Sequence, residues 1–139
     1  MANAYQQTFE IRTRGRGTTE ITTEVGQRVR ASGVVTGVAH VFVQHTSCSV
    51  MITENADPDV RVDLESLAGR WAPDADSAYR HDVEGTDDMA AHARSVLTGS
   101  SVSAPVGNGE LLLGTWQGIY LWEHRTAGHA RRVVVTVTG

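Results

Sequence analysis

The chain has 139 residues, of which 40% are hydrophobic and 20% charged, and its formal net charge is −4. This length favours a single domain over residues 1–139. A mildly acidic chain lacks the basic face with which nucleic-acid-binding proteins neutralise phosphates. All twelve basic residues other than histidine are arginines. The absence of lysine excludes Schiff-base chemistry and the phosphate-binding lysine of a P-loop.

Two further features bear on where the protein works. Cys48 is the only cysteine, so no intrachain disulfide can form, as is usual in a reducing compartment. The N-terminus lacks a basic segment followed by an apolar one, and no apolar run reaches about 18 residues. We therefore expect a cytoplasmic protein without a secretory signal or a membrane partner.

The N-terminal part of the chain predicts a strand, a turn and a helix. Residues 5–13 are polar and β-prone, which is typical of an edge strand, and a turn follows at 14–17. A short helix is expected over 22–32, with Thr22 as its N-cap and Gly33 as its stop.

Two consecutive strands are predicted at 34–45 and 48–54 from their alternating apolar residues. The apolar positions are odd in the first strand and even in the second. A one-residue shift of this kind turns the side chains to the other face of a sheet. The "HTS" segment at 45–47 is therefore expected to form a bulge or corner at which the chain changes direction.

Two helices are expected in the middle of the chain. Asp57 is a suitable N-cap for the first, which continues until Pro73. Thr86 is the expected N-cap of the second, and Gly99 is its expected end. The apolar stripe predicted to face the core on the second helix consists of Met89, Ala93, Val96 and Leu97.

Four strands are predicted in the C-terminal part, at 101–106, 111–113, 119–124 and 131–137, with a hairpin turn at 107–109. Both faces of the third are apolar, which indicates a central strand or one buried against another subunit. The whole pattern, with about three short helices, predicts an α+β fold.

Several polar residues stand where they need a partner or a function. His45, Glu54 and Glu123 lie on the apolar faces of strands, where an unpaired polar group is costly. Asp88 and His92 are four residues apart and share a helix face. For each of them, the alternative is a residue satisfied by ordinary structural hydrogen bonds.

Histidines from separate elements suggest a metal site. Three neutral imidazoles and a water form an open zinc site, although the separation of His81 and His92 is no recognised zinc spacing. Arg80 and Arg125 are candidate anion-binding residues, with a solvated arginine as the alternative. Cys48 is in phase with apolar neighbours, so we interpret it as a buried structural residue and not as a nucleophile.

Three segments carry a resemblance to a known family: "HTSCSVMITENADPDVRVDLE", "YRHDVEGTDDMAAHARSVLTGSS" and "GTWQGIYLWEHR". They resemble the signature blocks of the YjbQ-like family, also called the secondary thiamine-phosphate synthase enzyme family, and the similarity runs over nearly the whole chain. The resemblance implies a compact pseudobarrel or sandwich of two mostly antiparallel sheets, assembled as a homotrimer. It also implies a weak thiamine-phosphate-forming activity and a divalent metal, zinc or magnesium, in a polar pocket.

The residues that the resemblance implicates fall into three classes. The expected metal ligands are His45, His81 and His92. The expected catalytic residues are Glu54, Asp88, Glu123 and Arg125. The expected substrate-binding residues are Thr46, Ser47, Asn55, Glu84, Thr115, Trp116 and Gln117. The chain departs from the family pattern at Cys48, Asp82 and Val83, which argues against a functional role for these three side chains.

Three hypotheses for function follow. In the leading one, the protein joins a thiazole phosphate to a pyrimidine pyrophosphate and releases pyrophosphate, a reaction that depends mainly on positioning and charge stabilisation. In the second, the same site serves a metal-dependent hydrolase or lyase acting on a small phosphorylated metabolite. In the third, the protein is a trimer that binds a metal or a metabolite without catalysis.

Overall fold

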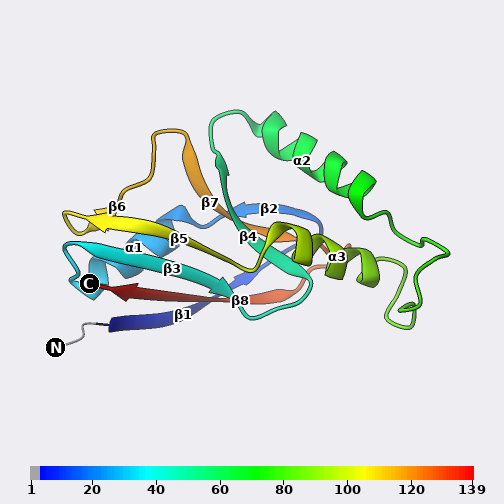
Figure 1. Cartoon of the computed structure of the whole chain (residues 1–139), viewed down its shortest axis with the longest axis horizontal. Coiled ribbons are helices and arrows are strands. Elements are labelled where there is room, and N and C mark those ends of the chain that lie inside the picture. Colours follow the sequence, from blue (N-terminus) through cyan, green and yellow to red (C-terminus); the bar gives the residue numbers. More distant parts are fainter. Residues whose placement is uncertain (1–3) are drawn as a thin grey trace.

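The computed structural model describes residues 4–139 and contains eight strands and three helices (Figure 1). The strands are Ala4–Arg12 (β1), Gly17–Glu20 (β2), Gly37–Val43 (β3), Cys48–Glu54 (β4), Ser101–Gly107 (β5), Glu110–Leu111 (β6), Gln117–Glu123 (β7) and Ala130–Thr138 (β8). The helices are Thr22–Ser32 (α1), Pro58–Trp71 (α2) and Asp88–Thr98 (α3). Within the described residues, no helix has the length and apolar character needed to cross a membrane.

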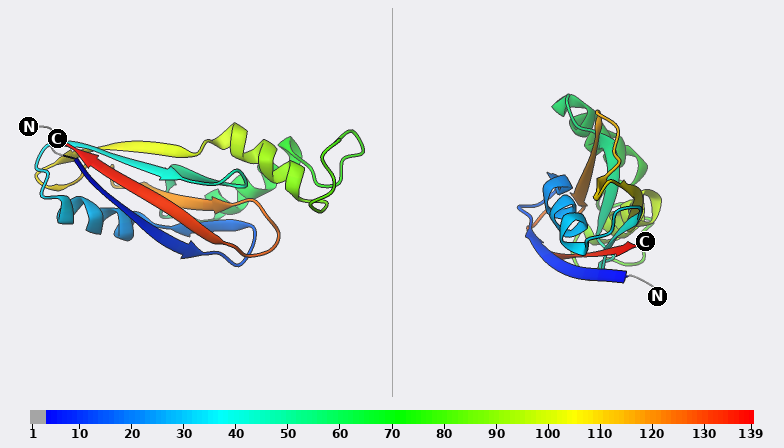
Figure 2. Two further views of the ribbon diagram at one scale, coloured as in Figure 1. Left: turned by 90° about the horizontal axis from the view of Figure 1, so that it is seen from below. Right: turned by 90° about the vertical axis from the view of Figure 1, so that its left-hand side faces the viewer.

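Two antiparallel sheets form the body of the molecule. The larger has the strand order β1-β8-β3-β5-β6 and the smaller the order β2-β7-β4. The predicted α+β fold of two antiparallel sheets with three helices is therefore confirmed. β1 is an edge strand, as expected, and pairs with β8 from Ala4↔Thr138 to Arg12↔Ala130. The start of β1 and the end of β8 consequently lie side by side (Figure 2).

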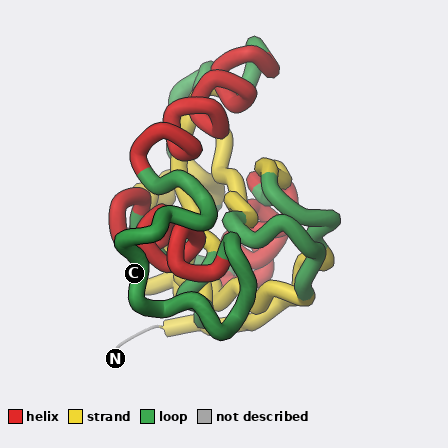
Figure 3. The backbone as a smooth tube through the Cα atoms, turned by 90° about the vertical axis from the view of Figure 1, so that its right-hand side faces the viewer, coloured by secondary structure: helices red, strands yellow, loops and turns green. Residues whose placement is uncertain are grey.

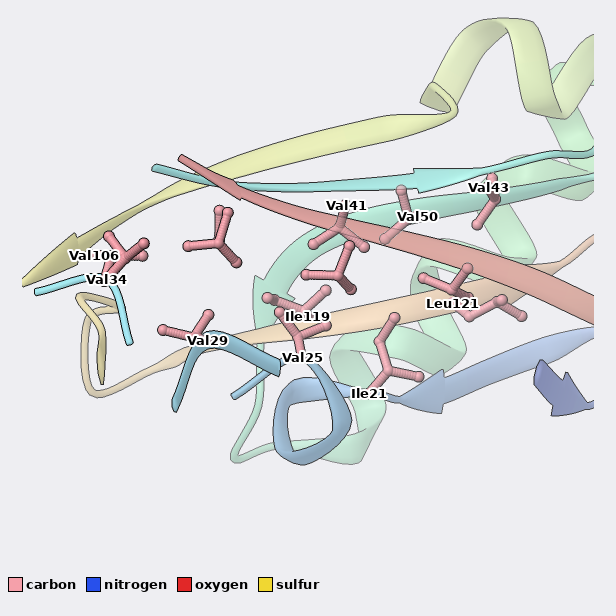
Figure 4. Packing of buried hydrophobic residues seen from close by; sticks show 14 of the residues in the cluster. Ile21, Val25, Val29, Val34, Val41, Val43, Val50, Val106, Ile119 and Leu121 are labelled. Carbon is pink, nitrogen blue, oxygen red and sulfur yellow. The ribbon is translucent and has the colours of Figure 1, made fainter. Parts of the chain in front are cut away.

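The hydrophobic core lies between the two sheets, with α1 packed against it (Figure 4). Val25 and Val29 of α1 are fully buried, as are Val41 of β3 and Ile119 and Leu121 of β7. Burying a large aliphatic side chain contributes about 1.5–3 kcal/mol, so this cluster is the main source of stability.

The predicted corner at 45–47 is confirmed, because the chain passes there from one sheet to the other. β3 belongs to the larger sheet and β4 to the smaller. Val41 and Val43 enter the core from β3, and Cys48 and Val50 enter it from β4. The corner thus accounts for the change from odd to even apolar positions.

β7 is the central strand of the smaller sheet, as its two apolar faces indicated. One face enters the core, and the other carries Tyr120 and Trp122 toward α2. The guanidinium carbon of Arg61 lies 4.8 Å from the centre of the Tyr120 ring, and Trp122 Nε1 donates to Glu65 Oε1 at 3.0 Å. Ala68 is the one fully buried residue of α2, and Figure 3 shows this helix extending away from the sheets.

The predicted N-cap is right for α2 and wrong for α1, although α1 covers the predicted residues 22–32. Asp57 caps α2 by accepting a hydrogen bond from the backbone N–H of Asp59 at 2.9 Å. Thr22, in contrast, is the first residue of α1 and not its cap. Its hydroxyl accepts from the backbone N–H of Ile119 at 2.9 Å, so a strand contact replaces the expected cap.

α3 differs from its prediction at its start and in its buried face. It begins at Asp88, two residues after Thr86, and the residue before it, Asp87, makes no capping side-chain bond. Val96 and Leu97 are 84% and 62% exposed, so the predicted apolar stripe does not face the core. The other two predicted stripe residues, Met89 and Ala93, are only partly buried. The buried residues of the helix are Asp88, Ala90, Ala91, Arg94 and Ser95.

The inner face of α3 is partly polar because neighbouring elements supply its partners. Arg94 NH1 donates to Glu65 Oε2 at 2.7 Å, and Ser95 Oγ donates to the carbonyl oxygen of Cys48 at 3.2 Å. These contacts give partners to two polar side chains on the buried face of α3, which the predicted apolar stripe did not include.

Some strand limits also differ. β2, at Gly17–Glu20, was not predicted, because four polar and small residues show no apolar alternation. β6 covers Glu110–Leu111 in place of 111–113, and β3 ends at Val43, so His45 lies in the corner.

Candidate metal centre

Three of the predicted site residues converge at the start of α3. The Nε2 atoms of His81 and His92 lie 2.7 and 3.0 Å from the same oxygen, Oδ2 of Asp88. The ligand atoms of these residues all lie within 4.8 Å of one another. Among residues 4–139, no other group of at least three His, Cys, Asp or Glu side chains has this spacing. We call this group the His81–Asp88–His92 cluster.

His92 is oriented for binding through Nε2. It lies one helical turn after Asp88, and its Nδ1 is 3.0 Å from the carbonyl oxygen of Thr46. If Nδ1 donates its proton to that oxygen, the lone pair of Nε2 faces the Asp88 carboxylate. Two acceptors at 3.0 Å repel each other unless a second proton or a cation lies between them.

The residues present fit a divalent metal. Zinc binds imidazole nitrogen and carboxylate oxygen at about 2.0–2.2 Å, which places adjacent ligand atoms of a tetrahedral site about 3.3–3.6 Å apart. The two nitrogen–oxygen distances of 2.7 and 3.0 Å are hydrogen-bond distances, so the ligand atoms would move apart slightly to admit the ion. The cluster is also accessible, since the side chains of His81 and His92 are 41% and 31% exposed.

Arg125 and Asp87 lie behind the cluster. Arg125 NH1 is 2.9 Å from Asp88 Oδ1, and its Nε donates to Asp87 Oδ2 at 2.9 Å. Its NH2 donates to the carbonyl oxygen of Glu84 at 3.0 Å. Most N–H groups of Arg125 are thus engaged within the protein, so its main contacts are structural partners and not an open anion site.

The surrounding charges keep both aspartates ionised. The hydrogen bond from Arg125 holds the pKa of Asp87 well below its ordinary value. Burial acts to raise the pKa of Asp88, but the hydrogen bond from His81 and the charges of His92 and Arg125 outweigh it, so this pKa is also lowered. An ionised carboxylate is the form that binds a metal.

The structure does not bring His45 into the cluster. Its Nε2 accepts from the backbone N–H of Arg132 at 2.7 Å, and its Nδ1 lies 3.3 Å from Arg131 NH1. Burial, followed by the charge of Arg131, lowers the pKa of His45. His45, Thr46 and His92 instead line one hollow of about 400 Å³ beside the cluster.

Glu123 is completely buried in an ion pair with Arg131. Arg131 donates to both carboxylate oxygens, with Nε at 2.8 Å from Oε1, and the Thr13 hydroxyl donates to Oε1 at 2.6 Å. Burial acts to raise the pKa of Glu123, but these hydrogen bonds outweigh it and lower the pKa. Arg131 also donates to Ser47 Oγ at 2.9 Å, so the pair holds the corner in place.

The remaining predicted residues lie at the other end of β7. Glu54 Oε2 accepts from the backbone N–H groups of Ala56 and Asp57 at 2.9 and 2.8 Å. The register pairs Cys48 with Glu123 and Glu54 with Gln117. At about 3.3 Å per residue, the two ends of β7 are roughly 20 Å apart.

Asn55 and Gln117 also use their polar atoms locally. Asn55 Nδ2 donates to the carbonyl oxygens of Thr115 and Gln117 at 3.3 and 3.4 Å. Gln117 Oε1 accepts from the backbone N–H of Gly114 at 2.8 Å, and Trp116 is exposed. The predicted site residues therefore form two separate groups within one chain, and only one of them contains the His81–Asp88–His92 cluster.

Two residues that the sequence interpretation did not single out are central to this end of the molecule. Asp87 stands where acidic residues are common at the start of a helix, and no sequence signal distinguishes it from them. Arg131 had a signal, because it occupies the same alternating phase as the buried Val133, Val135 and Val137.

Comparison with known proteins gives the family of this chain. Residues 7–139 match the model described as "UPF0047 protein YjbQ-like". The chain belongs to this family. A UPF0047 protein of Synechocystis sp. is 47% identical over 135 residues, which cover 97% of this chain and 92% of that protein.

Two further UPF0047 relatives agree in sequence and structure. The protein YjbQ of Salmonella typhimurium is 43% identical, with 97% of this chain and 98% of that protein covered. The crystal structure of a family member from Clostridium acetobutylicum has a TM-score of 0.86 at 38% identity, covering 94% of this chain and 98% of that chain. None of these relatives is named for an activity.

Proposed function

We propose that the protein is a divalent-metal-dependent enzyme acting on small phosphorylated metabolites. Its leading reaction is the joining of a thiazole phosphate to a pyrimidine pyrophosphate, with release of pyrophosphate. The observation that carries the proposal is the His81–Asp88–His92 cluster, in which two imidazole nitrogens approach one carboxylate oxygen at 2.7 and 3.0 Å. The choice of reaction is supported by the resemblance of three sequence blocks to the family.

The metal is zinc or magnesium in this proposal. Imidazole ligands favour zinc, whereas magnesium accompanies phosphate substrates that supply most of its oxygen ligands. Either ion would supply positive charge that neutralises a phosphate or pyrophosphate group.

The chain's own residues have distinct roles in the proposal. His81, Asp88 and His92 bind the metal, and Thr46 orients His92 through its carbonyl oxygen. The hollow of about 400 Å³ beside His92 accepts the organic part of a substrate. His45 lines that hollow next to the substrate and is no longer placed among the ligands.

Glu123 and Arg125 act indirectly. Glu123 fixes Arg131, which donates to Ser47, the residue that follows Thr46 of the hollow. Arg125 holds Asp88 from behind through its contact with Oδ1. Neither side chain needs to touch the substrate for its loss to reduce turnover.

A metal-dependent hydrolase or lyase is the second candidate, and the accessibility of the cluster favours it. Because both histidines are partly exposed, a water molecule can reach the ligand atoms from the solvent side. The same cluster would also serve a protein that binds a metal or a metabolite without turnover.

Metal titration of the apoprotein and an assay on both substrates test the proposal. The wild type should bind zinc or magnesium, and Asp88→Ala should weaken binding by more than the roughly 10–100-fold that follows loss of an outer-shell partner. Thiamine phosphate and pyrophosphate should then form at about 1–1000 per second if this reaction is the main one. Faster turnover on another phosphorylated metabolite favours the second candidate, and tight binding without any turnover favours the third. A wild type that binds no divalent metal contradicts the first two candidates and leaves only metabolite binding from the third.

We also propose that the protein assembles as a homotrimer. Trp71 of α2 and Leu97 of α3 are exposed and line an apolar hollow of about 440 Å³, and Val96 is exposed nearby. Contiguous exposed apolar groups of this kind mark interaction surfaces.

Light scattering should give a mass three times the 15.0 kDa of the chain. Leu97→Asp should lower that mass, whereas Val35→Asp, at an exposed residue between α1 and β3, should not. A monomeric wild type contradicts the assembly.

A further inference from the structure

We infer that Asp87 is a positioning residue which, through Arg125, makes Asp88 a metal ligand with one available oxygen. The inference rests on the proposed function, because it concerns the metal that the His81–Asp88–His92 cluster would hold. It assigns a role to a carboxylate that does not itself face the metal position.

Arg125 separates the two oxygens of Asp88. Its NH1 lies 2.9 Å from Oδ1, whereas the nitrogens of His81 and His92 both lie at Oδ2. Asp88 is buried, so its carboxylate cannot turn toward solvent to exchange these partners. A carboxylate held in this way offers a cation one oxygen. Calcium commonly takes both oxygens of a carboxylate, so the arrangement favours smaller cations that accept nitrogen ligands.

Asp87 fixes the position of Arg125. Arg125 Nε donates to Asp87 Oδ2 at 2.9 Å, and NH2 approaches Oδ1 at 3.4 Å. The backbone N–H and the hydroxyl of Thr126 also donate to Oδ2, at 2.9 and 3.2 Å. Because Asp87 is buried, these contacts form an enclosed network and not a solvated surface pair. Without Asp87, Arg125 has no carboxylate to hold it against Asp88 from this side.

The loop before α3 is shaped around this pair. Gly85 has a φ of +105°, which other residues rarely adopt. A Cβ atom there would lie 3.2 Å from Asp87 Oδ1 and 3.9 Å from Arg125 NH2. Glycine therefore permits both the backbone conformation and the close approach of the loop to Asp87.

Zinc affinity of the apoprotein, measured by competition with a chromophoric chelator, tests the inference. Asp87→Asn keeps an acceptor for Thr126 but removes the charge that holds Arg125. It should weaken zinc binding about 10-fold, the lower limit for loss of an outer-shell partner. The ratio of zinc to calcium affinity should fall as well, because a released Asp88 can offer both oxygens. Arg125→Gln should cause the same changes, and the double variant should add little to either.

Asp74→Asn is the matched control. Asp74 lies in the same connection between α2 and α3 and forms a two-contact ion pair at 2.6 Å with Arg16, which lies between β1 and β2. The control should leave zinc affinity and the zinc-to-calcium ratio unchanged. If Asp87→Asn fails to fold, Arg125→Gln provides the decisive comparison.

The outcomes separate this inference from the metal proposal. A wild type that binds zinc, with Asp87→Asn and Arg125→Gln binding it equally well, overturns the positioning role and leaves the metal site intact. A loss that Asp74→Asn reproduces also overturns it, because the effect is then a general one of the loop. A wild type that binds no zinc overturns both.

Discussion

The two ends of β7 use acidic residues differently, although each end lies beside the start of a helix. At one end, Glu54 and Asp57 accept hydrogen bonds from backbone N–H groups that lead into α2. At the other end, Asp87 and Asp88 face Arg125 and histidine side chains, and no side chain caps α3. Acidic residues near a helix start thus bind backbone N–H groups at α2 and side chains of a cluster at α3.

The difference has energetic consequences. A carboxylate that caps a helix contributes about 1 kcal/mol, and its loss stays local. Removing one partner of a buried ion pair leaves an uncompensated charge and costs about 3–5 kcal/mol. Substitutions at the Glu54 end should therefore change the free energy of unfolding only slightly and leave metal binding unchanged. Substitutions at the Asp88 end should change the free energy of unfolding more strongly or alter metal binding.

The largest effect is expected for Glu123→Ala. Arg131 would remain buried without its carboxylate partner, so the free energy of unfolding should fall by about 3–5 kcal/mol. Urea denaturation measures it, with Glu54→Ala as the comparison from the other end. The double variant Glu123→Leu with Arg131→Met removes both charges and should recover part of the loss. Equal, small losses for Glu123→Ala and Glu54→Ala would remove the distinction between the two ends.

A second effect concerns pH and His124, which follows Glu123. His124 is buried, its Nε2 is 2.7 Å from Ser49 Oγ, and burial lowers its pKa from 6.5 to about 3. In the unfolded chain His124 therefore binds a proton below about pH 6.5, whereas in the folded protein it binds one only below about pH 3. Stability is unaffected above this window and falls as pH decreases through it, by about 2 kcal/mol between pH 7 and pH 5. Denaturation of His124→Gln at both pH values should show a smaller difference, and an unchanged slope would contradict the assignment.

A smaller effect is expected for Asp57→Ala. The side chain accepts from Asp59 N–H at 2.9 Å, so its loss should cost about 1 kcal/mol of unfolding free energy. Zinc affinity should not change, because the cap lies at the end of β7 away from the cluster. Asp57→Asn retains a capping oxygen and should recover most of the stability. A change in zinc affinity would show that the two ends are coupled.

The smallest effect is expected for Thr86→Ala. The sequence pattern predicts a cap worth about 1 kcal/mol at this residue. In the structure Thr86 lies outside α3 and no side chain caps the helix, so the change should stay within about 0.5 kcal/mol. Thermal denaturation of Thr86→Ala beside Asp57→Ala tests this directly, and equal losses would restore the sequence interpretation.

Local patterns were sufficient for the sheets and insufficient for much of the site. Alternation of apolar residues predicted β4, the corner at 45–47 and the central position of β7, because each depends on neighbouring residues. The inner face of α3 could not be predicted, since it depends on Arg94 meeting Glu65 of another helix. The contact between Asp87 and Arg125 likewise joins residues 38 positions apart, and no spacing rule reports such a pair.

The pairing of β1 with β8 suggests that the backbone can be cyclised. Ala4 lies opposite Thr138, at the end of the fold away from the start of α3 (Figure 1). A short peptide joining these positions would close the backbone without disturbing the His81–Asp88–His92 cluster. Since a closed chain has fewer unfolded conformations, the cyclic protein should melt at a higher temperature. A cut at the exposed Asn108 would then yield a circular permutant whose new ends lie between β5 and β6.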